Sequence, residues 1–209
     1  MQYRIHRSGN FLTSRWSGGK TTQLAIYPEN CDYANQDFIW RISSATVDGP
    51  ESDFTKLPDY KRILVILEGE MTLSHEDGRQ VTLKEFEQDA FDGEDSVKSF
   101  GKAKDFNLMY QKENEGMIEV LTLSDDAITI PLGGSEKYDN QFHCFYCIGE
   151  RAEISYKIEN IALKKGDLLE IRAVSQKKIE LEIKGHGKLI NASIYFNVNN
   201  RADLIDEAL

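Results

Sequence analysis

The sequence has few cysteines and no long apolar run. Its three cysteines in 209 residues are an odd number, and a chain of this length buries a sizeable core without disulfides. We therefore expect free thiols and a reducing, cytoplasmic setting. No stretch of about 18 consecutive apolar residues occurs, and the N-terminus carries no apolar segment after its positive charges. These absences predict a soluble protein that is not exported and has no membrane partner.

Positive charge and histidine are also scarce. The chain has 25 Lys and Arg against 35 Asp and Glu, a net charge of -10. Its basic residues are scattered, which argues against a surface that tracks a phosphate backbone. The four histidines, His6, His75, His143 and His186, are far apart, and no three metal ligands can be assembled with sensible spacing. We expect no nucleic-acid partner, no metal and no cofactor.

One short motif resembles a phosphate-binding loop but fits it poorly. The stretch RWSGGKTTQ at 15–23 contains Gly-Lys-Thr, yet Ser14 stands where the loop needs glycine. The β-rich TTQLAIY follows instead of the helix whose N-terminus would hold phosphate. We expect a tight turn that directs Trp16 to one side and Thr21 and Gln23 to the other.

The run His143, Cys144, Phe145, Tyr146, Cys147 could indicate a zinc or redox site. The segment is typical of a strand, in which positions i and i+3 point to opposite faces. His143 and Cys147 would share a face but lie about 13 Å apart, which favours core packing. No Gly-x-Ser-x-Gly motif is present, and we assign no catalytic residue.

Most of the chain alternates with the period of two that strands show. In KKIELEIKG, Ile179, Leu181 and Ile183 share one face. The runs RILVILEGEMTL, MIEVLTL, AITIPL and SIYFNV are also β-rich. Only 202–209 looks helical, with 32–38 as a possible single turn. We predict an all-β sandwich or barrel with few short helices.

A weak internal repeat suggests two lobes. ILVILEGE at 63–70 matches HCFYCIGE at 143–150, and the same offset of eighty places VTLK at 81–84 on IALK at 161–164 without a gap. Identities are few, so chance is the alternative, but the alternation matches as well. We interpret the chain as two related β lobes.

The strand ending in Leu-Glu-Gly-Glu at 67–70 and the turn Leu-Lys-Lys-Gly-Asp at 163–167 resemble the cupin fold. This implies a bicupin, with jelly-roll lobes at 1–114 and 115–209 packed as one compact unit. Metal-binding cupins carry His-x-His and Glu just before this strand, whereas 60–62 here read Tyr-Lys-Arg. That difference agrees with the absence of a metal site.

Three segments place polar residues on one face and apolar residues on the other. The polar pairs are Thr21 with Gln23, Arg41 with Ser43, and Asp105 with Asn107; in the first segment, Thr22, Leu24 and Ile26 are expected on the opposite face. Two interpretations are open. The polar faces meet water, as is usual in antiparallel sheets, or they line the mouth of the first barrel as a pocket.

An ordered set of motifs in the first half resembles the HutD/Ves family. The motifs are WSGGKTTQ at 16–23, FIWRISSA at 38–45, GPESDF at 49–54, RILVILEG at 62–69, FDG at 91–93 and DFNLM at 105–109. The resemblance implies a bicupin without metal ligands and favours the pocket over a water-facing surface. Some members are linked to histidine utilisation, others are described as stress-induced, and no enzymatic activity is established. Members linked to histidine utilisation often have an acid where this chain has Gln23.

The family positions and the polar faces together imply nine ligand-binding residues. They are Trp16, Thr21, Gln23, Trp40, Arg41, Ser43, Arg62, Asp105 and Asn107. Arg41 and Arg62 would supply fork-shaped donors for a carboxylate. Trp16 or Trp40 would form an apolar wall, and Asp105 would orient the ligand or hold an arginine.

The leading functional hypothesis is binding of a small carboxylated metabolite by a sensor or regulator. One alternative is a metal-independent isomerase or lyase acting on a small acid, with Asp105 as acid/base. Another is a protein-interaction module, favoured if side chains fill the first-lobe cavity. A homodimer is expected by analogy with other cupin folds.

Overall fold

The computed structural model describes residues 2–174 and 178–197, which form strands joined by short turns. In the first half the strands are β1 (Gln2–His6), β2 (Leu12–Trp16), β3 (Gly19–Tyr27), β4 (Trp40–Val47), β5 (Glu51–Asp53), β6 (Tyr60–Gly69), β7 (Met71–His75), β8 (Gln80–Leu83), β9 (Gln88–Asp92), β10 (Val97–Phe100) and β11 (Ala103–Gln111). In the second half they are β12 (Glu115–Leu123), β13 (Ile128–Leu132), β14 (Asn140–Cys147), β15 (Arg151–Tyr156), β16 (Glu159–Lys164), β17 (Leu168–Val174) and β18 (Ile179–Phe196). The all-β prediction is confirmed.

Helical structure in the described residues is limited to two single 3-10 turns, η1 (Ser8–Asn10) and η2 (Tyr33–Asn35). The second lies within the predicted turn at 32–38, where the Asp32 carboxylate accepts a hydrogen bond from the Ala34 amide at 3.0 Å. The helix predicted at 202–209 lies outside the described residues. No helix in 2–174 or 178–197 has the length and apolar character needed to cross a membrane.

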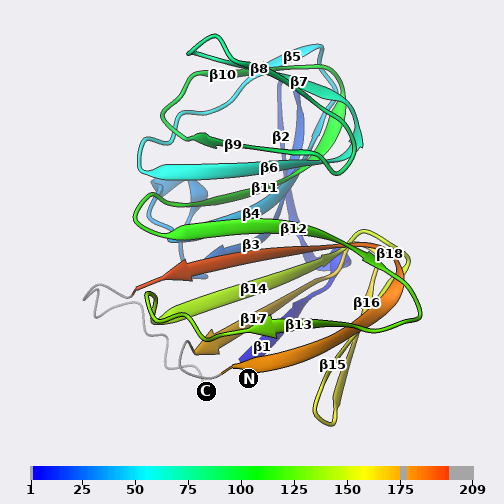
Figure 1. Cartoon of the computed structure of the whole chain (residues 1–209). Helices are drawn as coiled ribbons and strands as arrows, with labels where there is room; N and C mark the ends of the chain where they lie inside the picture. Colours follow the sequence, from blue (N-terminus) through cyan, green and yellow to red (C-terminus); the bar gives the residue numbers. More distant parts are fainter. Residues whose placement is uncertain (1, 175–177, 198–209) are drawn as a thin grey trace.

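The strands of the described residues form three sheets, which Figure 1 shows as an upper and a lower group. The upper group contains a six-stranded sheet, β2-β3-β4-β11-β6-β9, facing a four-stranded sheet, β5-β10-β7-β8. The lower group is a curled eight-stranded sheet, and the long strand β18 runs through it and pairs with β12, β13, β14 and β15. β1 joins this lower sheet by pairing with β17, so Gln2–His6 lies with the second-half strands. The division at residue 114 stays a prediction.

The same pairing pattern occurs in both groups. β11 lies between β4 and β6, and the C-terminal part of β18 lies between β12 and β14. β10 lies between β5 and β7, and the N-terminal part of β18 lies between β13 and β15. The strand pair β10 and β11 is thus equivalent to β18. The chain turns at Gly101, with φ +107, in the first case and bends at Gly185 and Gly187, with φ +154 and +96, in the second.

The offset of eighty between the halves is not uniform. Phe86 and Gly166, eighty positions apart, donate their amides to Ile66 and Cys147, each at 2.7 Å. These acceptors are 81 positions apart, so the first half has one residue more between the strand and the turn than the second half. The predicted alignment of Ile63 with His143 therefore matches residues that lie on opposite faces of their strands. With an offset of 81, Ile63 is equivalent to Cys144.

Phe86 shows how far the first turn departs from the cupin pattern. It has φ +68 where Gly166 has φ +86. This left-handed conformation costs a side-chain-bearing residue roughly 1–2 kcal/mol. The Phe86 ring is half-buried and receives the Lys188 ammonium 5.3 Å from its centroid, which recovers part of that cost.

The largest core cluster joins the two halves. It combines Trp40, Val65 and Phe106 from the first half with Phe142 and Ile194 from the second. Separate clusters fill the interior of each half. Because the six-stranded sheet and the eight-stranded sheet each bury one face in this cluster, the two halves pack as one unit.

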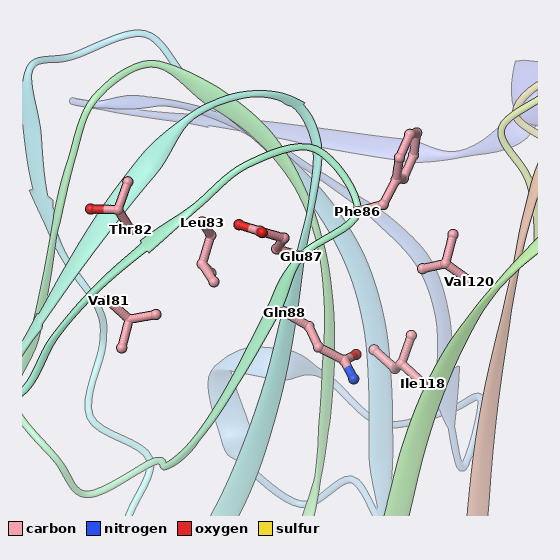
Figure 2. Close-up of a pocket in the computed structure, with 8 residues that line it drawn as sticks. All are labelled: Val81, Thr82, Leu83, Phe86, Glu87, Gln88, Ile118 and Val120. Atoms are coloured by element: carbon pink, nitrogen blue, oxygen red, sulfur yellow. The ribbon is translucent and has the colours of Figure 1, made fainter.

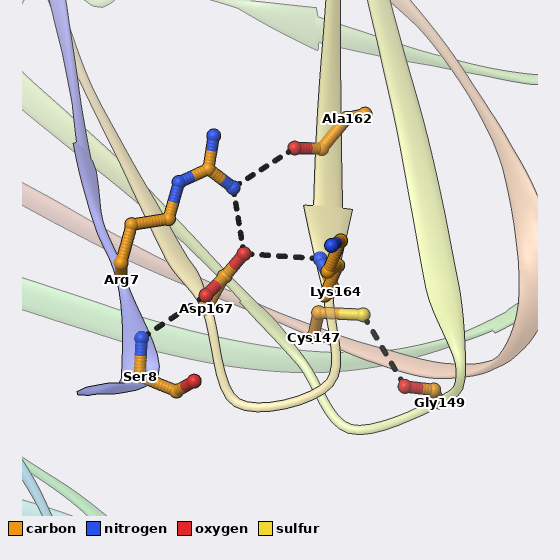
Figure 3. A network of polar contacts seen from close by, with 7 residues as sticks. All are labelled: Arg7, Ser8, Cys147, Gly149, Ala162, Lys164 and Asp167. Atoms are coloured by element: carbon orange, nitrogen blue, oxygen red, sulfur yellow. Dashed lines mark hydrogen bonds and ion pairs between the residues drawn. The ribbon is translucent and has the colours of Figure 1, made fainter.

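Asp167, in the Leu-Lys-Lys-Gly-Asp turn, fastens the N-terminal segment to the second half (Figure 3). Its carboxylate accepts hydrogen bonds from Arg7 Nη1 at 2.7 Å, the Ser8 amide at 3.0 Å and the Lys164 amide at 3.1 Å. Burial raises the pKa of this carboxyl, but these donors outweigh burial and hold the pKa below its usual value.

Replacing Asp167 with alanine is expected to lower the free energy of unfolding by about 2 kcal/mol at pH 7, because three donors lose their acceptor. The folded-state pKa is lowered, so the stabilisation is present above the unfolded value of about 3.9 and is lost as pH falls below it. Urea unfolding at pH 7 and at acid pH measures this, with Asp48→Ala at an exposed aspartate as control. An equal loss at both pH values would contradict a role for the ionised carboxylate.

Candidate functional site

A cavity of about 340 Å³ opens between the two sheets of the first half. Its lining residues are Ser14, Trp16, Thr21, Tyr33, Arg41, Ser43, Ala45, Val47, Ser52, Asp53, Phe54, Thr55, Arg62, Ser99, Asp105, Asn107 and Met109. Seven of the nine predicted ligand-binding residues are among them. These residues come from strands that are distant in the sequence. They meet because β11 pairs with both β4 and β6, and each strand points alternate residues to the same interior.

Arg41 lies on the β4 side of the cavity with 6% of its surface exposed. Its Nε donates to Gln23 Oε1 at 2.9 Å, its Nη1 donates to Ser43 Oγ at 3.2 Å, and its guanidinium carbon lies 4.3 Å from the Tyr33 ring centroid. Burial lowers the pKa of Arg41, and the charge of Arg62 lowers it further. The two guanidiniums therefore repel each other in one cavity.

Arg62, on β6, is more deeply buried, with 2% exposed. It donates through Nη2 to the Thr55 carbonyl, and its guanidinium lies 5.6 Å from the Phe54 ring centroid. Its Nε is buried and has no hydrogen-bond partner among the described residues. Burial lowers the pKa of Arg62, although nearby Tyr33 and Asp105 oppose the shift. An unpaired donor at this depth favours an acceptor supplied from outside.

Asp105 is the buried carboxyl of the cavity, with 3% exposed. Its Oδ1 accepts from the Ala45 amide at 3.0 Å. Burial raises the pKa of Asp105 to about 7, against the opposing effects of the Ala45 amide and the Arg62 charge. Next to it, Asn107 Oδ1 is buried without a hydrogen-bond partner among the described residues.

The cavity therefore carries an excess of positive charge. Neither Arg41 nor Arg62 forms an ion pair within 4.0 Å with a carboxylate of 2–174 or 178–197. The other acidic residue of the lining, Asp53, is exposed and lies 3.7 Å from Lys98. Two guanidiniums and one buried carboxyl suit an anionic ligand, because buried charges need a partner.

Gln23 and Trp40 do not line the cavity. Gln23 lies behind Arg41 and accepts from its Nε, so it positions that guanidinium. Trp40 is fully buried in the cluster between the two halves, stacked on Tyr27 and tilted against Phe142. It lies on the opposite face of β4 from Arg41, which corrects its expected place at the pocket wall.

Trp16 forms the aromatic wall together with Tyr33 and Phe54. Its Nε1 donates to Thr21 Oγ1 at 3.1 Å, so the two residues share a side of the β2–β3 hairpin. The expectation that the turn separates them is wrong, because Trp16 pairs with Gly19 and residues two apart on a strand share a face. Gly18 fits beneath the indole ring, where a Cβ would lie 2.1 Å from it.

A β-bulge between Gln23 and Ala25 changes the faces of β3. Leu24 and Ala25 both enter the cluster between the halves, while Ile26 packs with Met109 on the cavity side. Ile26 therefore does not share a face with Leu24 as strict alternation predicts. A bulge adds one residue to one strand and reverses the alternation beyond it.

Several cavity residues were missed from sequence. Tyr33, Phe54 and Thr55 lie in the turn before β4 and in the loop after β5. Loop residues have no periodic pattern that assigns them a face, so alternation could not find them. Phe54 could have been identified from the sequence, since it is the last residue of the GPESDF motif.

A second, open groove of about 530 Å³ lies between the β8–β9 turn and β12 (Figure 2). Phe86, Val120 and Ile118 border it, and Glu87 is its charged residue. It lacks the converging charged groups of the first cavity. Among the described residues, no three His, Cys, Asp or Glu side chains gather as metal ligands would.

Cys144 and His143 lie on opposite faces of β14 in the second half. Cys144 packs in the cluster between the halves, and Cys147 packs inside the second half. His143 Nδ1 lies 2.9 Å from Ser193 Oγ, and burial lowers the pKa of His143 to about 4. These contacts agree with the core-packing interpretation of the motif.

Comparison with known proteins agrees with this architecture. The model of the HutD family matches residues 8–191. Protein Ves of Escherichia fergusonii is 33% identical over 100 residues, which cover 46% of this chain and 50% of Ves. The match thus spans about half the length of that curated relative.

Two crystal structures share the fold. A conserved protein of unknown function from Pseudomonas aeruginosa PAO1 has a TM-score of 0.78 at 20% identity, covering 93% of this chain and 98% of the other. HutD from Pseudomonas fluorescens SBW25, in a formate condition, has a TM-score of 0.73 at 17% identity with the same coverage. At these identities the likeness concerns the fold alone.

Proposed function

Since this chain belongs to the HutD family of cupin-like proteins, we propose that its first-half cavity binds a small carboxylated metabolite without a metal. In this proposal the protein is a cytoplasmic sensor or regulator, in amino-acid catabolism or a stress response. The observation that carries the proposal is the pair of buried guanidiniums, Arg41 and Arg62, that face one cavity without an ion pair to a described carboxylate.

The geometry supports a carboxylate in particular. A guanidinium presents parallel N–H donors that match the two oxygens of a carboxylate. Trp16, Tyr33 and Phe54 supply apolar walls for a short carbon chain. Converging polar groups beside apolar walls, in a cavity of a few hundred Å³, are typical of small-molecule sites.

Isothermal titration of the wild-type protein with acetate, succinate and glutarate tests the proposal. We expect saturable binding of at least one of these anions, and no binding of acetamide or succinamide, which have similar shapes without charge. Wild-type protein that binds none of the carboxylates, or binds the amides equally well, would refute the proposal.

A metal-independent isomerase or lyase is the second candidate, favoured by Asp105. Its pKa near 7 matches what a general acid or base needs at neutral pH. The test is prolonged incubation of protein with each carboxylate that binds, followed by NMR in deuterated water. Exchange of a carbon-bound proton that is lost in Asp105→Asn would support the enzyme, and bound ligand that stays unchanged would favour the sensor.

A further inference from the structure

The charge of the cavity depends on the proton of one buried group. Asp105 on β11 faces Arg41 from β4 and Arg62 from β6, with the Tyr33 phenol from η2 beside them. β5 contributes the exposed Asp53, which is paired with Lys98. The β3 and β10 residues of the lining do not titrate. Ionised Asp105 therefore leaves one positive charge unbalanced in the cavity, and protonated Asp105 leaves two.

We infer that Asp105 is the specificity-determining group of this site, so that its ionised form selects a monocarboxylate and its protonated form selects a dicarboxylate. This inference rests on the proposed function and deepens it. An unbalanced charge in a buried site is costly, so the best ligand neutralises the cavity. A dianion placed against ionised Asp105 would leave one negative charge in excess.

The position of Asp105 makes this proton exchange possible. Its Oδ1 is occupied by the Ala45 amide, while its other oxygen is not held by a described donor and the residue lines the cavity. Burial already places its pKa near 7. A dianion beside it raises that pKa further, so dicarboxylate binding takes up a proton and weakens as pH rises above 7.

The experiment compares succinate with monomethyl succinate, and glutarate with monomethyl glutarate, at pH 6.5 and 8.5. Each pair differs by one charge. The monoester carboxyl titrates in the range of a glutamate side chain, and the second carboxyl of each diacid somewhat higher because of the first charge, so all four ligands are mainly in their fully ionised forms at both pH values. We expect the affinity ratio of dicarboxylate to monoester to fall about tenfold or more between the two pH values. At pH 8.5, where Asp105 is mostly ionised before binding, titration in buffers of different ionisation enthalpy should show uptake of nearly one proton per dicarboxylate.

Asp105→Asn is the decisive variant, because its amide oxygen can still accept from the Ala45 amide and it fixes the neutral state. We expect it to keep the dicarboxylate preference at both pH values. Asp48→Asn, at an exposed carboxylate outside the cavity lining, should keep the pH dependence of the wild type. A constant ratio in the wild type, or an unchanged pH dependence in Asp105→Asn, overturns this inference alone. Failure of every carboxylate to bind overturns the proposed function as well.

Discussion

Replacing Arg41 with alanine is expected to weaken carboxylate binding by about 30-fold or more. Truncating one partner of a buried, hydrogen-bonded charge pair costs about 2–5 kcal/mol, and each 1.4 kcal/mol is roughly a factor of ten in affinity. Arg41 is held by Gln23 and Ser43 and backed by the Tyr33 ring, so its fork is oriented before a ligand arrives. Isothermal titration with the tightest-binding carboxylate measures the loss.

Two further variants separate charge from geometry. Arg41→Lys keeps a positive charge but not the paired donors, so we expect it to lose a smaller but measurable share of affinity. Arg15→Ala removes an exposed arginine from β2 and should bind as the wild type does. Unchanged binding in Arg41→Ala would show that the anion site lies elsewhere.

The Arg41→Ala substitution should affect the free energy of unfolding much less than it affects binding. Arg41 is buried without an ion pair to a described carboxylate, so the wild-type protein bears the cost of desolvating its charge. Alanine removes that cost while leaving Gln23 and Ser43 with one partner fewer. We therefore expect a change in unfolding free energy within about 1 kcal/mol. Such a contrast is typical of a functional residue.

The fold was predictable because alternation reports directly on which residues are buried. In β18, Ile179, Leu181 and Ile183 are buried and Glu180 and Glu182 are exposed, as the period of two predicts. What alternation could not predict is that β18 continues past Gly185 into the other part of the curled sheet. Bending of a strand depends on tertiary packing around its glycines, which local sequence does not encode.

The site was predictable only where strands stay regular. Arg41, Ser43 and Asn107 reach the cavity because β4 and β11 pair in register at these positions. Ile26 was misplaced because the bulge at Gln23 reverses the faces of β3 beyond it. The family likeness placed Trp40 at the pocket, whereas strict alternation puts it on the face opposite Arg41, where the structure has it.

Trp40→Ala is expected to cost about 3–5 kcal/mol of unfolding free energy, which is the usual range for deleting a buried tryptophan. Trp40 is fully buried and packs against Tyr27 from its own half and Phe142 from the other. Its indole N–H has no hydrogen-bond partner among the described residues, so the loss comes from packing alone. Urea unfolding followed by circular dichroism measures it.

Trp40→Phe and Trp16→Ala are the matched controls. Phenylalanine keeps most of the buried ring, and no hydrogen bond is lost because the Trp40 indole N–H has no described partner. We therefore expect a loss of unfolding free energy nearer about 1–2 kcal/mol. Trp16 is 37% exposed at the cavity mouth, and its loss should lower ligand affinity more than stability. A small cost for Trp40→Ala would contradict its place in the shared core. A large cost, with ligand binding retained at low temperature, would show that Trp40 joins the two halves and does not hold the ligand, although it is the neighbour of Arg41 in the sequence.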